Sequence, residues 1–130
     1  GNGKTYSGGS ASNYGNSYDQ DTMIGIYLDL DNNKLYFSKD GTLQNSGTGV
    51  SITAPGSTSL GNYFFSAMDY GNSVSNVYEW NFGGGTPTSI SSGNADDNGY
   101  GNFEYSPNIT GDGAAKSFYA LNSKNLAEFG

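Results

Sequence analysis

The sequence contains no cysteine, no histidine and no arginine. Without cysteine, the chain can form no disulfide framework and carries no thiolate chemistry. Without histidine, it lacks both the commonest general base and the commonest metal ligand. Five lysines face twelve acidic residues, giving a net charge of −7, whereas nucleic-acid-binding proteins neutralise phosphates with clustered lysine and arginine. The composition therefore argues against nucleic acid and against anionic membranes as partners.

Long hydrophobic runs are also absent, so no segment is expected to insert into a membrane. Apolar residues make up only 34% of the 130 residues, and 21 residues are glycine. Aromatic residues, at 15% of the chain, offset this deficit, because each ring can bury a large area. A chain of this length ordinarily forms one domain. The balance favours an all-β domain with long polar loops over a helical one.

The strongest pattern lies in residues 23–44, MIGIYLDLDNNKLYFSKDGTLQ. Aliphatic residues recur at every second position of its first half, which is the period of a strand with one buried side. Residues 31–33 and Asp40-Gly41 are turn signals, and they separate this strand from a second strand and from a third at residues 42–44. The sequence predicts a β-meander whose apolar face needs a second sheet to cover it. This apolar face consists of Ile24, Ile26, Leu28, Leu30, Leu35 and Phe37.

Outside this window the periodicity is weaker. Residues 1–21 are expected to form a polar surface loop, and residues 122–130 have weak helical character at most. A strand at residues 77–82 is expected to bury Tyr78, Trp80 and Phe82. The other expected elements are a short strand at residues 50–53, a strand at residues 63–68, and a final strand or docked extended segment at residues 118–121.

Residues 24–44 resemble the most characteristic stretch of SPRY domains. In that family a strand of the form IGxxLDLD is followed by a turn, an aromatic strand and a second turn. Two later stretches, YFFSAMDY at residues 63–70 and VYEWNFGG at residues 77–84, resemble family strands that follow in the same order. The segments GKTY at residues 3–6 and YG at residues 14–15 are similar to the loop that precedes the first strand.

The C-terminal part carries a narrower likeness. Residues 94–105 (NADDNGYGNFEY) and 118–126 (FYALNSKNL) resemble the C-terminal extension of SPRY-type proteins of tailed bacteriophages. Residues 106–108 (SPN) stand where a double proline is common in those proteins. The resemblance implies two parts: residues 1–83 as the C-terminal part of a SPRY-like sandwich, and residues 84–130 as a Gly- and Asn-rich extension that packs on the same domain.

The resemblance implies a bent β-sandwich of two antiparallel sheets with a concanavalin-like jelly-roll architecture. The N-terminal strands of the family have no counterpart before Gly1. An incomplete sandwich would leave strand edges and a large apolar face exposed, and both favour aggregation. The missing strands are therefore expected upstream in the same polypeptide or in a neighbouring chain, so that the protein is oligomeric or part of a larger chain.

Two acidic segments deserve comparison with calcium sites. Residues 29–33 (DLDNN) place oxygen ligands at alternate positions, but Asp40 stands where a calcium loop has its bidentate glutamate. Asp96 and Asp97 lie in a polar loop whose carbonyl groups could add ligands. A strand that ends in a turn, and a solvated acidic loop, explain the two segments without a metal. We expect no metal and no other cofactor.

Motifs for catalysis are absent. The chain has no GxSxG, no phosphate-cradling loop with its lysine, and no metal triad. A carboxylate-only glycosidase would need a pair of acidic side chains about 5–10 Å apart in one cleft, and the sequence shows no recognisable pair. We therefore expect a non-enzymatic protein.

Loops rich in Tyr, Asn, Ser, Gly and Asp suit recognition, because tyrosine provides contact area at low entropic cost. They also suit sugars, which pack on aromatic rings beside amide and carboxylate groups. In SPRY domains a partner is generally held by loops at one side of the sandwich, and the resemblance places Asp69, Tyr70 and Asn72 in a contact turn. Tyr70 is equally well explained as a cover for the end of the core. Further candidates by composition are Tyr14, Tyr18 and Tyr100.

The resemblance thus implies a non-enzymatic structural or adhesion protein of a tailed phage, located on the virion surface in a tail or fibre. Its expected partners are neighbouring virion subunits, or a glycan or protein of the host surface. The alternative is an exposed or secreted carbohydrate- or peptide-binding module of a bacterium. Tyrosine-rich loops buried between copies would indicate the first, and loops ordered around a ligand would indicate the second.

Overall fold

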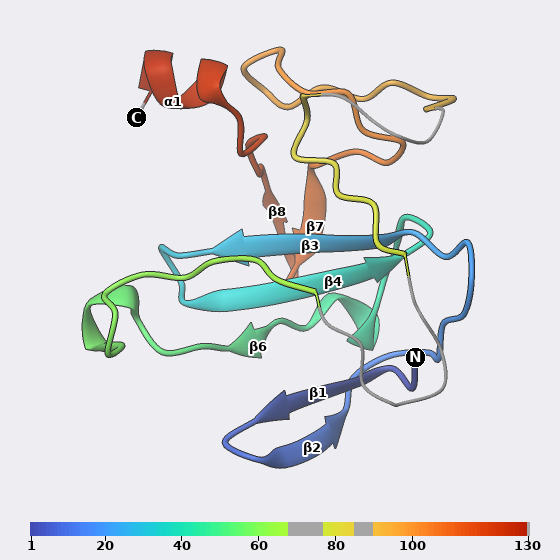
Figure 1. Cartoon of the computed structure of the whole chain (residues 1–130), viewed down its shortest axis with the longest axis vertical. Helices are drawn as coiled ribbons and strands as arrows, with labels where there is room; N and C mark the ends of the chain where they lie inside the picture. Colours follow the sequence, from blue (N-terminus) through green and yellow to red (C-terminus); the bar gives the residue numbers. More distant parts are fainter. Residues whose placement is uncertain (68–76, 85–89, 130) are drawn as a thin grey trace.

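The computed structural model describes residues 1–67, 77–84 and 90–129 (Figure 1). Within these ranges the strands form three separate antiparallel sheets, accompanied by one short α-helix. The expected all-β class is confirmed, whereas the SPRY-like sandwich stays a prediction. The elements are β1 (Lys4–Ser7), β2 (Ser10–Asn13), β3 (Ile24–Asp29), β4 (Lys34–Lys39), β5 (Thr42–Leu43), β6 (Val50–Ser51), β7 (Ile109–Gly111), β8 (Ala114–Lys116) and α1 (Ser123–Phe129), with single 3₁₀ turns at Asn45–Gly47 and Pro55–Ser57.

The central sheet contains β3, β4, β5 and β6, and β4 pairs with each of the other three strands. Ile26 lies opposite Phe37 in the β3–β4 register, so the apolar face forms as the alternation predicts. At the β4–β5 turn, Asp40 and Gly41 have φ values of 47° and 78°. Positive φ at both central residues matches the right-handed twist of the flanking strands. The predicted meander is therefore present, with shorter strands at its end.

The deepest burial occurs on the opposite face of the central sheet. Tyr36 is 0% exposed, and Tyr27 and Ser38 are buried beside it. The ring of Phe118 packs edge-on against both tyrosines, with centroid distances of 5.4 Å to Tyr27 and 6.2 Å to Tyr36. Residues 118–121 thus form a docked extended segment and not a final strand. The core of the described structure lies between this segment and the two tyrosines.

The apolar face is only partly covered by the described residues. Leu30 is 46% exposed, Ile24 is also exposed, and the remaining members are half-buried. The ring of Tyr14 packs edge-on against Phe37, with centroids 5.5 Å apart. Aliphatic side chains at both ends of the face therefore remain open to solvent.

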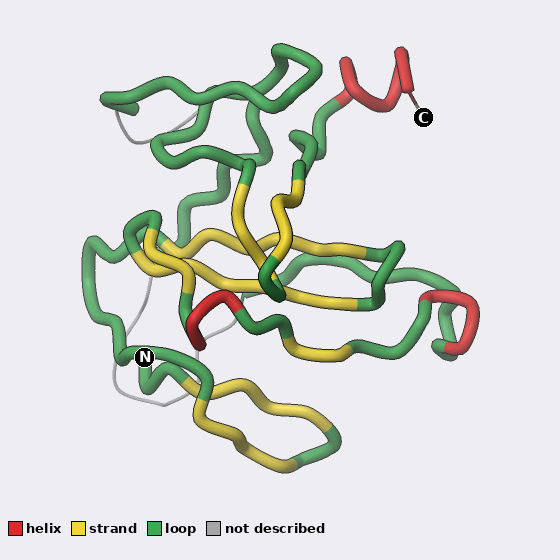
Figure 2. The backbone as a smooth tube through the Cα atoms, turned by 180° about the vertical axis from the view of Figure 1, so that it is seen from behind, coloured by secondary structure: helices red, strands yellow, loops and turns green. Residues whose placement is uncertain are grey.

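The hairpin β7–β8 crosses the buried face of the central sheet, as the views in Figures 1 and 2 show from opposite sides. Its turn contains Asp112-Gly113, with φ values of 50° and 77°. The Tyr36 hydroxyl donates to the Asp112 carboxylate at 2.8 Å, and Lys116 forms an ion pair with Asp29 at 3.0 Å. Burial and the Asp112 carboxylate raise the pKa of Tyr36, which keeps its hydroxyl protonated as a donor.

Two glycines allow the close approach of this hairpin to the sheet. A Cβ atom at Gly49 or at Gly111 would lie 2.7 Å from Cε1 of Tyr36. Such contacts are far shorter than van der Waals distance, so a side chain at either position would displace the ring. The absence of side chains on both sides of Tyr36 thus permits its complete burial.

The predicted surface loop at residues 1–21 contains a hairpin instead. Strands β1 and β2 pair through a Gly8-Gly9 turn with φ values of 55° and 80°. The side chains of the hairpin are almost all exposed, and it projects away from the central sheet (Figure 2). A two-stranded hairpin in water is marginally stable by itself.

The prediction of strands at residues 63–68 and 77–82 is wrong for the part of these ranges that the structure describes. Residues 63–67 and 77–82 are irregular, and Met68 lies outside the described residues. Phe65 contacts Trp80 and Phe82, with ring centroids 6.5 Å and 6.0 Å apart. Trp80 and Phe82 stay partly exposed, because the rings pack on one another and not on a sheet.

Helix α1 is longer than the weak helical character of residues 122–130 suggests. The Asn122 side chain caps it, because Oδ1 accepts hydrogen bonds from the backbone N–H groups of Lys124 at 3.1 Å and Asn125 at 3.0 Å. An asparagine at this position satisfies donors that the first turn leaves unpaired. Within the described residues, no helix is long and apolar enough to cross a membrane.

Candidate functional site

The site residues expected from the resemblance, Asp69, Tyr70 and Asn72, lie outside the described residues. Their role as a contact turn stays a prediction. The three tyrosines expected from composition are described, and they do not form one site. Tyr14 and Tyr18 lie near the N-terminal segment, whereas Tyr100 contacts α1 through Glu128.

Tyr14 and Tyr18 have structural contacts. The Tyr14 hydroxyl donates to the carbonyl of Thr48 at 3.0 Å, and burial raises the pKa of Tyr14. Tyr18 pairs with Gly1 through backbone hydrogen bonds in both directions, and its ring lies against Gly1. Tyr14 therefore fixes the N-terminal segment to the domain, whereas Tyr18 holds Gly1 within that segment.

Tyr100 holds the C-terminal helix. Its hydroxyl donates to the Glu128 carboxylate at 2.7 Å, and the Lys124 ammonium lies 5.5 Å from the centre of its ring. The hydrogen bond to Glu128, together with burial, raises the pKa of Tyr100. Its ring and hydroxyl are thus engaged within the chain.

The Asp96 carboxylate is a structural anchor and not a metal ligand. Asp96 is 6% exposed, and Oδ1 accepts from the backbone N–H groups of Asn98 at 3.0 Å and Tyr100 at 2.9 Å. Oδ2 accepts from the backbone N–H of Ala120 at 2.8 Å and from the amide of Asn125 at 2.7 Å. Calcium needs a shell of oxygen atoms, whereas this carboxylate is surrounded by N–H donors.

Burial alone would raise the pKa of Asp96, but the hydrogen bonds from Ala120, Asn125, Tyr100 and Asn98 lower it below its ordinary value. Hydrogen bonds to the charged form favour ionisation. Asp96 therefore joins the loop at residues 96–100 to the segment that precedes and begins α1, as an ionised carboxylate.

The other segment compared with calcium sites is also engaged. Asp29 accepts hydrogen bonds from the backbone and side chain of Asn32 and pairs with Lys116. Burial tends to raise the pKa of Asp29, but the hydrogen bonds from Asn32 and Lys116 lower it. In the ranges that the structure describes, no three or more acidic side chains gather as a metal site would require.

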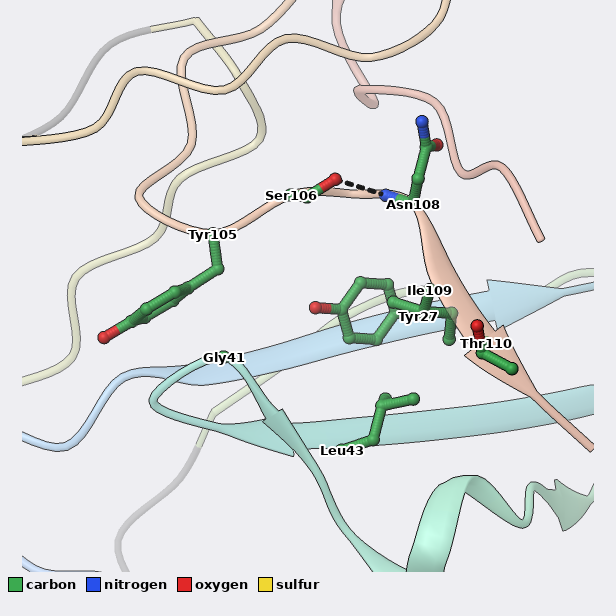
Figure 3. Close-up of a pocket in the computed structure, with 8 residues that line it drawn as sticks. All are labelled: Tyr27, Gly41, Leu43, Tyr105, Ser106, Asn108, Ile109 and Thr110. Carbon is green, nitrogen blue, oxygen red and sulfur yellow. Dashed lines mark hydrogen bonds between the residues drawn. The ribbon is translucent and has the colours of Figure 1, made fainter. Parts of the chain in front are cut away.

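A groove runs between the β4–β5 turn and β7 (Figure 3). Its volume is about 380 Å³, and none of its lining residues carries a charge. Tyr105 and Tyr27 lie on two sides of it, with Gly41 between them. The lining consists of Tyr27, Gly41, Leu43, Tyr105, Ser106, Asn108, Ile109 and Thr110.

Gly41 is required for the position of Tyr105. A Cβ atom at Gly41 would lie 2.4 Å from Cδ1 of the Tyr105 ring, and the φ of 78° at this residue also disfavours a side chain. The hydroxyl groups of Tyr27 and Ser38 form a hydrogen bond at 3.2 Å. The Ser106 hydroxyl accepts from the backbone N–H of Asn108 at 3.1 Å. The groove therefore has one exposed aromatic ring and a fixed, uncharged polar rim.

A second hollow, of about 450 Å³, lies beside α1. We call it the C-terminal hollow. Leu121, Leu126 and Phe129 are all more than half exposed there. Its lining is Asn98, Tyr119, Ala120, Leu121, Asn125, Leu126 and Phe129.

No pattern in the sequence points to the groove. Its residues come from the meander and from residues 105–110, and no local pattern connects the two stretches. The aromatic residue at Tyr105 was the one usable signal, because it ends an apolar stretch just before Pro107. Comparison with known proteins adds no further guide: no family model, no curated protein and no solved structure matches this chain.

Proposed function

We propose that this chain is a non-enzymatic structural or adhesion protein of a tailed-phage virion, and that it packs against neighbouring subunits. The resemblance of residues 94–105 and 118–126 to phage SPRY-type extensions supports the virion assignment. The assembly role is supported by the distribution of apolar residues in the described structure.

The observation that carries the assembly role is the incompletely covered apolar face. Among the described residues, the buried apolar side chains are those of Tyr27, Tyr36 and Ala120. Many large apolar side chains are instead exposed, including Leu30 on the apolar face. Exposed apolar surface of this kind marks interaction sites or aggregation hazards. A neighbouring subunit that covers the apolar face would remove the hazard and complete a second layer over the central sheet.

The SPRY-like bent sandwich belongs to the same proposal. A sandwich has a sheet on each side of its core, and the apolar face of β3 and β4 is the surface on which the second sheet would pack. The alternation of residues 24–30 and the register of β3 with β4 support this arrangement.

Replacing Leu30 with lysine is expected to weaken self-association at least about tenfold, because burying an unpaired ammonium at an apolar contact is costly. Since Leu30 is 46% exposed, the free energy of unfolding should change by only about 0.5 kcal/mol. Light scattering over a range of protein concentrations measures the association.

Leu60→Lys is the matched control, since Leu60 is highly exposed and lies outside the apolar face. It should associate like the wild type. A wild-type protein that stays monomeric at all concentrations, or an equal loss in Leu60→Lys, would contradict self-assembly through the apolar face.

The second candidate function is that of an exposed or secreted carbohydrate- or peptide-binding module. The uncharged groove beside Tyr105 is the specific observation that favours it. Pockets for small ligands are concave, largely apolar and supplied with a few oriented polar groups, and the groove has these properties on a small scale.

A further inference from the structure

We infer that the groove between the β4–β5 turn and β7 is a binding site for a neutral saccharide, with Tyr105 as the stacking platform. This inference rests on the second candidate function, ligand binding, and is independent of subunit assembly.

The charge of the groove selects the class of ligand. None of its eight lining residues is acidic or basic, and the chain as a whole has a net charge of −7. A phosphate or carboxylate ligand would meet no cation in the groove and would be repelled by the surrounding field. A cationic ligand would find no carboxylate in the lining to pair with. The ligand that fits is uncharged.

The aromatic ring of Tyr105 provides the principal contact surface. Tyr105 is 37% exposed, and its ring lies against Gly41, where no Cβ intervenes. Tyr105 is therefore held by packing while part of its ring stays accessible at the groove. The apolar C–H side of a pyranose ring packs on such a surface, since the face of an aromatic ring is electron-rich.

The lining also carries hydroxyl groups that can form hydrogen bonds with a polyol. In the described part of the chain, the hydroxyls of Tyr105 and Thr110 have no recorded partner, and that of Ser106 accepts from a backbone N–H while its own proton stays available. Leu43 and Ile109 supply the apolar part of the lining. Asn108 contributes less, because its amide donates to Asp97 at 2.6 Å and points away from Leu43 in Figure 3.

The size and shape of the groove favour a saccharide over a peptide. Its volume of about 380 Å³ lies near the lower end of small-molecule pockets, which span about 300–1,000 Å³. One or two sugar rings suit this space. Peptide recognition instead uses an open sheet edge or a row of apolar pockets, and the groove offers a single aromatic ring with hydroxyl groups.

The test is saturation-transfer difference NMR on the intact chain, with the methyl glycosides of glucose, galactose, N-acetylglucosamine and N-acetylgalactosamine as probes. We expect at least one of them to bind with a Kd on the order of 1 mM, as suits a small, open contact. Glucuronic acid and N-acetylneuraminic acid, as anionic probes, should bind more weakly or not at all.

Variants locate the binding. Tyr105→Ala should weaken it at least about tenfold, since a stacking contact of roughly 1.4 kcal/mol is lost. Tyr105→Phe keeps the ring and should retain most of the affinity, whereas Thr110→Val should lose a smaller part through the missing hydroxyl. Tyr6→Ala is the matched control, because Tyr6 is 65% exposed on β1 and is not part of the groove lining.

The inference is overturned if no neutral probe shows saturation transfer, if Tyr105→Ala binds like the wild type, or if Tyr6→Ala loses as much as Tyr105→Ala. Far-UV circular dichroism of Tyr105→Ala should match that of the wild type, and Tyr105→Phe separates loss of the ring from loss of fold. None of these outcomes depends on the oligomeric state. If saccharide binding is not found, the assembly role is still tested separately by the Leu30→Lys experiment.

Discussion

Replacing Tyr36 with alanine is expected to remove about 3–5 kcal/mol from the free energy of unfolding. Tyr36 is the largest fully buried side chain among the described residues. Its ring fills the space between Gly49 and Gly111 and meets Phe118 edge-on. Its hydroxyl also donates to Asp112. An alanine at this position leaves a cavity between the central sheet and the β7–β8 hairpin.

A loss of this size is a large part of the stability of an ordinary domain, which is about 5–15 kcal/mol. Thermal unfolding followed by circular dichroism should show a Tm lower by roughly 10–20 °C. Tyr36→Phe retains the ring, and its loss should be much smaller. Tyr6→Ala, an exposed tyrosine, should unfold like the wild type. If Tyr36→Ala is as stable as Tyr6→Ala, the buried face of the central sheet is not the core.

Replacing Asp96 with alanine is expected to cost about 2–4 kcal/mol, because it leaves buried N–H donors without an acceptor. The loss should be concentrated at the C-terminal end. The carboxylate binds the backbone N–H of Ala120 and the amide of Asn125, so its removal releases the start of α1. Hydrogen exchange should speed up at Ala120 and Asn125, and far-UV circular dichroism should lose helical signal.

Asp97→Ala is the control for Asp96→Ala. Asp97 is the next acidic residue and is exposed, so its removal should leave exchange at Ala120 unchanged. Asp97 accepts from Asn108 and not from Ala120 or Asn125, so equal effects of the two substitutions on exchange at Ala120 and Asn125 would contradict the specific role of the Asp96 hydrogen bonds.

The same residue predicts how stability depends on pH. The pKa of Asp96 is lowered in the folded state, whereas an unfolded aspartate titrates at about 3.9. Its contribution is therefore fully present above about pH 3.9 and is lost as the pH falls through the lower, folded value. Urea unfolding from pH 6 to pH 2 should show this loss in the wild type. In Asp96→Asn the dependence should be shallower, and it should not vanish, since the pKa of Asp29 is also lowered.

The sequence predicts the structure correctly where the alternation of side chains and the turn residues indicate the same local fold. The alternation from residue 24 predicts β3, the Asp40-Gly41 turn predicts the β4–β5 hairpin, and both are present. Asp112-Gly113 is the same dipeptide with the same positive φ values, but its flanks contain small residues without alternation. That hairpin is held by contacts from distant residues such as Tyr36 and Asp29, which no local pattern reveals.

The aromatic segments show the opposite case. Residues 63–67 and 77–82 alternate as strands do, yet a strand also needs a partner for its backbone hydrogen bonds. In the described structure the ring of Phe65 packs on Trp80 and Phe82, and the chain around them is irregular. The alternation of aromatic residues predicts strands that bury one row of rings against a sheet. In the structure the rings pack on one another instead.

The candidate site depends on the same long-range packing. Gly41 was read as a turn residue, and nothing in the sequence indicates that its missing side chain makes room for Tyr105. The compositional candidates Tyr14, Tyr18 and Tyr100 are tyrosines that the structure uses for internal contacts. Composition alone cannot separate a tyrosine that anchors the chain from one that is available to a ligand.

The crossing of β7–β8 over the central sheet has a consequence for synthesis of the protein. Tyr36 and Asp112 are 76 residues apart in the chain. A ribosome that adds roughly 5–20 residues per second needs roughly 4–15 s to produce the second residue after the first. During that interval the meander is complete while the face around Tyr36 has no cover. Until its C-terminal hairpin emerges, the nascent chain therefore exposes surface of the kind that makes folding intermediates prone to aggregation.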